Sequence, residues 1–232
     1  LIERIEHAEF LDALSKPLID AVAKAVRPRQ VRNWASGTPL GHPVHPMLTD
    51  LPIGAWTMAA LLDLIGGRSA APAADLLVKA GVLAAVPTAA SGLNDWSDTY
   101  GPETRLGLVH AGANTGALLV FCASARARSR GHRRFGKLLA LAGLGAMGAG
   151  AYLGGHLSFS KGTNVNRTAW EVGPEDWTAV LEDSELAEGV GRKVDSGGVA
   201  GRRYRGEGRI GALSNTCSHM GGPLDEGTFA DG

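Results

Sequence analysis

The sequence predicts a membrane domain of four α-helices followed by a small all-β domain. The mean hydropathy of the 232 residues is near zero, but apolar and charged residues are strongly segregated along the chain. Four long apolar stretches lie between residues 40 and 160, and short alternating segments separated by glycines come later. Apolar stretches of about 20 residues predict membrane helices, and short alternating segments between turn residues predict strands.

The charge balance and the cysteine content exclude two classes of protein. With 23 basic and 23 acidic residues, the net charge gives no reason to expect a nucleic-acid partner. Two cysteines, Cys122 and Cys217, do not suggest a disulfide framework. The expected surroundings are a lipid bilayer.

Residues 1–39 are expected to form an amphipathic N-terminal arm. Apolar residues recur at helical spacing through residues 2–26, and Pro17 and Pro28 are expected to bound or kink the helix. Two interpretations stay open: a helix lying on the membrane surface, or a solvated helix packed on the domain that follows.

The four apolar stretches cover residues 48–65, 74–93, 106–125 and 138–159. At ~1.5 Å rise per residue, about 20 residues cross the ~30 Å hydrocarbon layer. The last two stretches contain no Asp, Glu, Lys or Arg, whereas helices of a soluble bundle need a polar face. Two glycine pairs at i, i+4, Gly112 with Gly116 and Gly150 with Gly154, are expected to let helices approach closely.

The entrance to the first stretch carries the motif His42-Pro43-Val44-His45-Pro46, followed by Pro52-Ile53-Gly54, and Gly154-Gly155-His156-Leu157 lies near the end of the fourth. In these motifs residues 40–160 resemble an uncharacterised bacterial family of four-helix membrane domains. The resemblance implies a multi-pass protein of the bacterial inner (cytoplasmic) membrane and names no activity.

Counting crossings places four histidines on one side of the membrane: His42, His45, His110 and His156. Histidines at membrane depth are candidate ligands, two for a haem or three for a metal ion. The alternative is hydrogen bonding to lipid headgroups, to Asp50, or to Asn94 and Asp95. Basic residues are about equally frequent on both sides, so the side that faces the cytoplasm stays unassigned.

A compact loop near the C-terminus, Cys217-Ser218-His219-Met220-Gly221-Gly222-Pro223-Leu224, places a thiol and an imidazole two residues apart. It resembles the first ligand loop, C-x-H-x-G-G-P-L, of Rieske proteins, whose [2Fe–2S] cluster takes one Cys and one His from each of two loops. The resemblance implies that Cys217 and His219 are ligands. The position of an additional loop cysteine in respiratory Rieske proteins is Gly222 here, which implies the ferredoxin and oxygenase branch.

Two strands are predicted before this loop, with residues 199–204 pairing with residues 209–214 through Gly206-Glu207-Gly208. The resemblance also implies a second ligand loop, C-P-x-H, after a hairpin whose turn begins at Asp231-Gly232. No second Cys/His pair occurs in these 232 residues. We therefore expect the chain, which begins with Leu1 in place of Met, to be a fragment of a longer protein.

The expected fold class is a membrane all-α four-helix domain, residues 40–160, followed by a truncated all-β Rieske-type domain, residues 161–232. The expected function is one-electron transfer with a redox partner protein, so the chain is a component of an electron-transfer system more than an enzyme by itself. One alternative is an oxygenase with a downstream iron domain. Another is a haem- or metal-binding membrane sensor or structural protein.

Overall fold

The computed structural model describes residues 1–169 and 171–227. The chain divides into two compact units, residues 1–157 and residues 158–232. The hairpin turn expected at Asp231-Gly232 lies outside the described residues.

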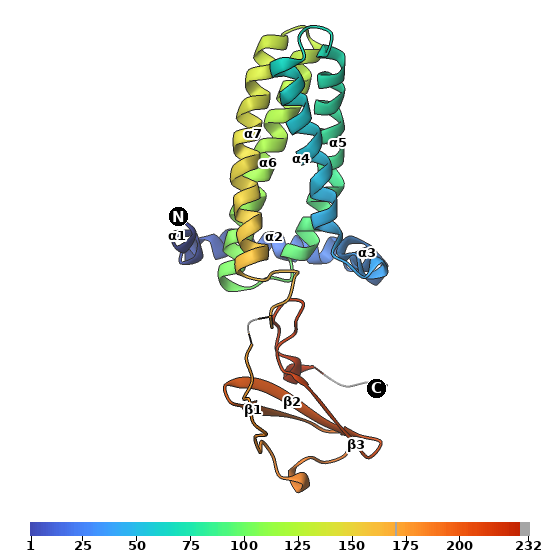
Figure 1. Cartoon of the computed structure of the whole chain (residues 1–232), viewed down its shortest axis with the longest axis vertical. Helices are drawn as coiled ribbons and strands as arrows, with labels where there is room; N and C mark the ends of the chain where they lie inside the picture. The colour runs from blue at the N-terminus through green and yellow to red at the C-terminus, as the bar shows by residue number, and fades with distance from the viewer. Residues whose placement is uncertain (170, 228–232) are drawn as a thin grey trace. The chain divides into compact units, whose positions relative to one another are not determined.

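The N-terminal arm of the first unit is a series of short helices. It consists of α1 (Ile2–Glu6), a single turn at Glu9–Leu11, α2 (Asp12–Ala25) and α3 (Arg29–Ser36). Pro28 precedes α3, as expected, but Pro17 lies inside α2 without ending it. The arm runs across the end of the bundle at which α4 begins (Figure 1) and contacts α4, α5 and α6.

The arm shows features of both interpretations considered from the sequence. Phe10, Leu14 and Leu18 are exposed apolar side chains, spaced four residues apart as on one face of a helix. At the same time Arg105 of α6 binds the arm, because its Nε and Nη2 donate to the carboxylate of Asp12 at 2.8 and 2.7 Å. A further bond from Arg105 Nη1 reaches the carbonyl of Glu6 at 2.6 Å. The hydrogen bond from Arg105 lowers the pKa of Asp12.

The rest of the first unit is a bundle of four long helices: α4 (Val44–Ile65), α5 (Ala71–Trp96), α6 (Gly101–Ser129) and α7 (Arg133–Gly155), with a wider helical turn at His156–Ser160. By length and composition all four are able to cross a membrane. Each begins several residues before the predicted apolar stretch, because the helix continues through its polar first turns. Pro72 and Pro102 at the first turns of α5 and α6 favour these early starts.

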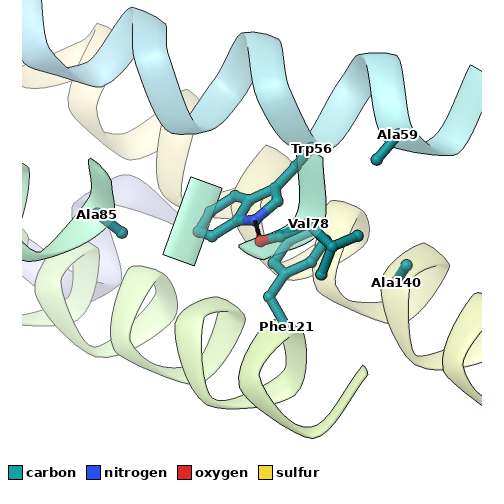
Figure 2. Packing of buried hydrophobic residues seen from close by; sticks show 6 residues of the cluster. All are labelled: Trp56, Ala59, Val78, Ala85, Phe121 and Ala140. Carbon is teal, nitrogen blue, oxygen red and sulfur yellow. Dashed lines mark hydrogen bonds between the residues drawn. The ribbon is translucent and has the colours of Figure 1, made fainter. Parts of the chain in front are cut away.

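The centre of the bundle is an aromatic stack between diagonal helices. Helices α4 and α6 each pack against both α5 and α7, so α4 and α6 face each other across the diagonal. Trp56 of α4 and Phe121 of α6 span this diagonal with ring centroids 3.9 Å apart and planes 6° from parallel. The indole N–H of Trp56 donates to the carbonyl of Val78 at 3.2 Å (Figure 2). This bond satisfies the one polar group of the stack.

The two helical hairpins, α4–α5 and α6–α7, repeat each other. Inward-facing residues of α4 match those of α6 at a constant separation of 65 positions. The matched residues are His45, Pro52, Trp56, Ala59 and Asp63 in α4, and His110, Ala117, Phe121, Ser124 and Arg128 in α6. The pairs Trp56–Phe121 and Asp63–Arg128 contact each other directly. The bundle is thus a tandem repeat whose equivalent residues meet across the diagonal.

Glycines on α5 and α7 make room for these side chains. A Cβ at Gly81 of α5 would lie 2.3 Å from the Trp56 indole, and one at Gly143 of α7 would lie 2.8 Å from the Phe121 ring. The glycine pair predicted on α7 does permit close contact, since Gly150 and Gly154 face side chains of α6. The prediction for α6 was wrong within this chain, because nothing lies within 4 Å of a Cβ at either Gly112 or Gly116.

An ion-pair network closes the end of the bundle away from the arm. Arg128, whose side chain is 1% exposed, binds Asp63 and donates to Asp75 at 2.9 Å. Arg133 donates to Asp63 at 2.7 Å and also binds Asp75, while Lys137 donates to the carbonyl of Asp63 at 2.7 Å. Asp63 and Asp75, two of the charged residues within or next to the apolar stretches, are therefore paired with basic residues of α6 and α7, as is favourable for charges near hydrocarbon.

The second unit contains an antiparallel sheet of order β1 (Gly191–Ser196), β2 (Val199–Gly206) and β3 (Arg209–Ser214). The predicted β2–β3 hairpin is confirmed, with Gly206 opposite Arg209 and a two-residue turn at Glu207-Gly208. Both turn residues have positive φ, 52° and 72°, which is typical of the turn that matches strand twist. Strand β1 was not predicted, since its sequence, Gly-Arg-Lys-Val-Asp-Ser, lacks apolar alternation.

The network predicts the effect of Asp63→Ala on stability. Without this carboxylate the buried Arg128 keeps one of its two carboxylate partners, Asp75, besides the hydroxyl of Ser124, so the free energy of unfolding should fall by about 3 kcal/mol. Thermal unfolding in detergent micelles measures the change. Asp50→Ala, an exposed site on the same helix, is the matched control. Equal effects of the two substitutions would contradict a stabilising network.

The Asp12–Arg105 bond predicts acid release of the arm. Because the folded-state pKa of Asp12 is lowered, its stabilising contribution is complete above the usual carboxyl value of about 3.9 and is lost as the pH falls through the lowered value. Hydrogen exchange of α2 amides, corrected for intrinsic rates, should show loss of protection in acid. Asp12→Asn should lose protection already at pH 7, whereas Asp20→Asn, exposed on the same helix, should behave like the unaltered chain.

Candidate metal-binding loop and membrane histidines

The candidate ligand loop follows directly from the end of β3 and is closed at its base by backbone hydrogen bonds. The N–H of Asn215 donates to the carbonyl of Ala200 on β2 at 2.7 Å. On the other side of the loop, the N–H of Leu224 donates to the carbonyl of Asn215, also at 2.7 Å. The sheet therefore fixes both ends of the segment that carries Cys217 and His219.

Within the loop, two further bonds fold the backbone around the cysteine. The N–H of Cys217 donates to the carbonyl of Gly222 at 2.8 Å, and the N–H of Gly221 donates to the carbonyl of Cys217 at 2.7 Å. Gly221 has φ +79°, a conformation in which a side chain would be strained. This explains why the sequence has glycine there, and the turn holds Cys217 and His219 in one short loop.

A side-chain bond supports the loop from beneath. The amide of the buried Asn215 donates to the carboxylate of Asp225, and this bond, together with Lys193 at 3.5 Å, lowers the pKa of Asp225. A third segment joins the loop where the N–H of Arg167 donates to the carbonyl of Ser218 at 2.8 Å. None of these supporting contacts was predicted, because they join residues far apart in the sequence.

The donor atoms suit half of a [2Fe–2S] site. Cys217 is a free, half-buried thiol, and His219 is exposed. One thiolate and one imidazole from a single loop are the set that each loop of a Rieske site supplies. The other cysteine, Cys122, is exposed on α6 in the first unit. The second Cys/His pair is therefore not among these 232 residues.

The structure gives the membrane histidines different surroundings. His45 Nδ1 lies 2.9 Å from the carbonyl of Thr88 on α5, and His110 Nδ1 lies 2.8 Å from the carbonyl of Gly150 on α7. These backbone partners replace the carboxylate and amide partners considered from the sequence. His156 lies 3.9 Å from the carboxylate of Glu6 in the arm, and His42 is exposed before α4.

A metal site made from three of these histidines is not formed. Among the residues that the structure describes, no three His, Cys, Asp or Glu side chains are grouped so as to hold a metal ion. The expectation of a three-histidine metal site is therefore not met in the described part of the chain. His45 and His110 differ from the other two membrane histidines, because they occupy equivalent places in the repeated hairpins.

Two family models match separate parts of the chain. Residues 41–167 match the family model described as "Predicted membrane protein (DUF2231)", and residues 176–232 match the model of the Rieske [2Fe-2S] domain. No curated protein and no solved structure matches the chain. Because the first match covers more than half of the residues, the chain belongs to the DUF2231 family of membrane proteins, and it continues into a Rieske [2Fe-2S] domain.

Proposed function

We propose that this protein is a membrane-anchored carrier of single electrons, in which Cys217 and His219 bind one half of a [2Fe–2S] cluster. The Rieske domain makes it an iron–sulfur protein of the electron-transfer type with a membrane domain. The observation that supports the ligand assignment is the folded loop, in which Cys217 bonds through both its N–H and its carbonyl. A Rieske cluster accepts and releases one electron at a time.

The residues around the ligands have separable roles in this proposal. Cys217 binds as a thiolate and His219 through a neutral ring nitrogen, so both ligands must be deprotonated at the binding atom. The Asn215–Asp225 bond and the backbone hydrogen bonds of the loop hold the two ligands in place and do not themselves bind iron.

The membrane domain supplies the location. We place the protein in the bacterial inner membrane, with the four helices α4 to α7 as anchor and the exposed Phe10, Leu14 and Leu18 of the arm at the lipid surface. The redox partner is a protein, since an exposed His219 offers an edge at which a docking partner exchanges electrons.

A second candidate is a Rieske oxygenase, in which the cluster delivers electrons to a separate mononuclear iron. That iron requires two histidines and a carboxylate on a further domain. The coding sequence beyond Gly232 distinguishes the candidates. A second ligand loop of the form C-P-x-H within roughly ten residues is expected by either, and a long continuation with a two-histidine, one-carboxylate site only by the oxygenase.

The ligand assignment predicts the spectroscopy of the complete gene product. Reduced protein should give the electron paramagnetic resonance signal of a Rieske cluster, and Cys217→Ser or His219→Ala should abolish it, because either change removes an iron ligand. Cys122→Ser and His132→Ala, which change the same residue types on the membrane unit, should leave it intact. A cluster signal that survives Cys217→Ser would refute the assignment.

The chain that ends at Gly232 provides a further check. Each iron would lack half of its protein ligands, so this chain purified alone should show no Rieske signal. A signal from it would mean that a second chain completes the site, and the proposal of a single-chain cluster would then be wrong.

A further inference from the structure

The seam between α4 and α6 is closed along one half of the bundle and only half-buried along the other. We use seam for the inward-facing residues of α4 and α6, which are spaced alternately four and three positions apart along each helix. Equivalent seam positions in the two helices have similar burial. Both helices are buried at the middle positions, which are Pro52, Trp56 and Ala59 in α4 and Ala117, Phe121 and Ser124 in α6. Toward the arm, the next seam positions are half-buried: His45 and Thr49 in α4, and His110 and Asn114 in α6.

The half-buried section contains two imidazoles that are oriented in the same way. A backbone carbonyl only accepts hydrogen bonds, so the Nδ1 atoms of His45 and His110 carry the protons that they donate to Thr88 and Gly150. In a neutral ring the lone pair then lies on Nε2, and in His110 this atom faces the amide Nδ2 of Asn114 at 3.2 Å. A ring held by an Nδ1–H bond to a carbonyl is the usual state of a histidine that ligates metal through Nε2.

Both rings also rest on a glycine placed one helical turn after the carbonyl. A Cβ at Gly92 of α5 would lie 2.5 Å from Cε1 of His45, and a Cβ at Gly154 of α7 would lie 2.8 Å from Cε1 of His110. Each hairpin therefore contains the same arrangement: a histidine on the first helix, and on the second helix a backbone carbonyl that accepts from its ring and a glycine that makes room for it.

We propose that His45 and His110 are the two axial ligands of a haem bound between α4 and α6 in the half of the bundle nearest the arm. Each hairpin contributes one Nε2, and the two ligands come from diagonal helices at matched depth. This site is separate from the iron–sulfur loop and goes beyond the proposed function of that loop.

The number of donors selects a haem over a bare metal ion. A Zn²⁺ or similar ion requires about four ligands, and no group of three His, Cys, Asp or Glu side chains occurs among residues 1–169 and 171–227. A haem iron already has four ring nitrogens and requires only two axial donors, which matches a histidine pair. The Nδ2 atom of Asn114 lies 3.2 Å from Nε2 of His110. When that nitrogen binds iron, the Asn114 amide would have to turn away from Nε2 and would then lie beside the ligated ring.

The test uses the full 232-residue chain, purified in detergent from cells supplied with a haem precursor. Its visible spectrum and haem content should show about one haem per chain in a six-coordinate, low-spin state. His45→Ala and His110→Ala should each reduce bound haem at least about tenfold and remove the low-spin spectrum. His42→Ala and His132→Ala are matched controls that keep both candidate ligands, and they should bind haem as the unaltered chain does.

A second measurement separates loss of a ligand from loss of the fold. Added imidazole should restore the six-coordinate spectrum of His110→Ala when haemin is titrated into the purified protein, because the free base occupies the vacated position. The proposal is overturned if the unaltered chain is folded but binds no haemin. It is also overturned if either alanine variant keeps the low-spin haem without imidazole. Neither result bears on the cluster signal, which depends on Cys217 and His219.

Discussion

The requirement that every polar group within hydrocarbon have a partner inside the protein governs the membrane unit. The indole N–H of Trp56 bonds the carbonyl of Val78, and the guanidinium of Arg128 binds two carboxylates. The imidazoles of His45 and His110 bond carbonyls of neighbouring helices. Such bonds have few competitors in lipid, so they determine which helices are neighbours and at what depth each residue lies.

Glycine makes several of these bonds accessible. Large side chains on α4 and α6 reach the backbones of α5 and α7 only because the facing residues, among them Gly81 and Gly143, have no side chain. Association of helices in lipid depends on such close packing, since burial of apolar surface gives little advantage there. The high glycine content of the chain is therefore part of the specificity of the bundle.

The sequence was sufficient to predict four membrane helices and one hairpin, because these depend on local signals. An apolar stretch of sufficient length predicts a span wherever its neighbours lie, and Gly206-Glu207-Gly208 predicts a turn by itself. The repeat of the two hairpins was not predicted, since among the matched inward-facing positions only His45 and His110 carry the same residue. Matched residues are equivalent in their depth within the bundle and in facing its centre. This is recognisable only from the folded structure, in which Trp56 stacks on Phe121.

The candidate sites show the same division. The Cys217 and His219 pair was recognisable because both residues belong to one contiguous loop, whereas the supporting Asn215–Asp225 bond and strand β1 depend on the folded sheet. For the membrane histidines, the sequence grouped four residues by the side of the membrane. The structure separates His45 and His110, which have equivalent environments, from His42 and His156, which do not. The side of the membrane on which a histidine lies can be predicted by counting the helices that cross it. That two histidines have matching surroundings can be learned only from the folded structure.

The opposite charges at matched positions of the repeat have a consequence for how the hairpins recognise each other. Asp63 of the first hairpin meets Arg128 at the equivalent place in the second. If two copies of α4–α5 came together in the arrangement that α4–α5 and α6–α7 adopt, Asp63 would face Asp63, and two copies of α6–α7 would bring Arg128 against Arg128. Unpaired like charges in such a place are strongly unfavourable. Each hairpin is therefore complementary to the other hairpin and not to a second copy of itself. Pairing of α4–α5 with α6–α7 is favoured over pairing of two identical hairpins from different chains.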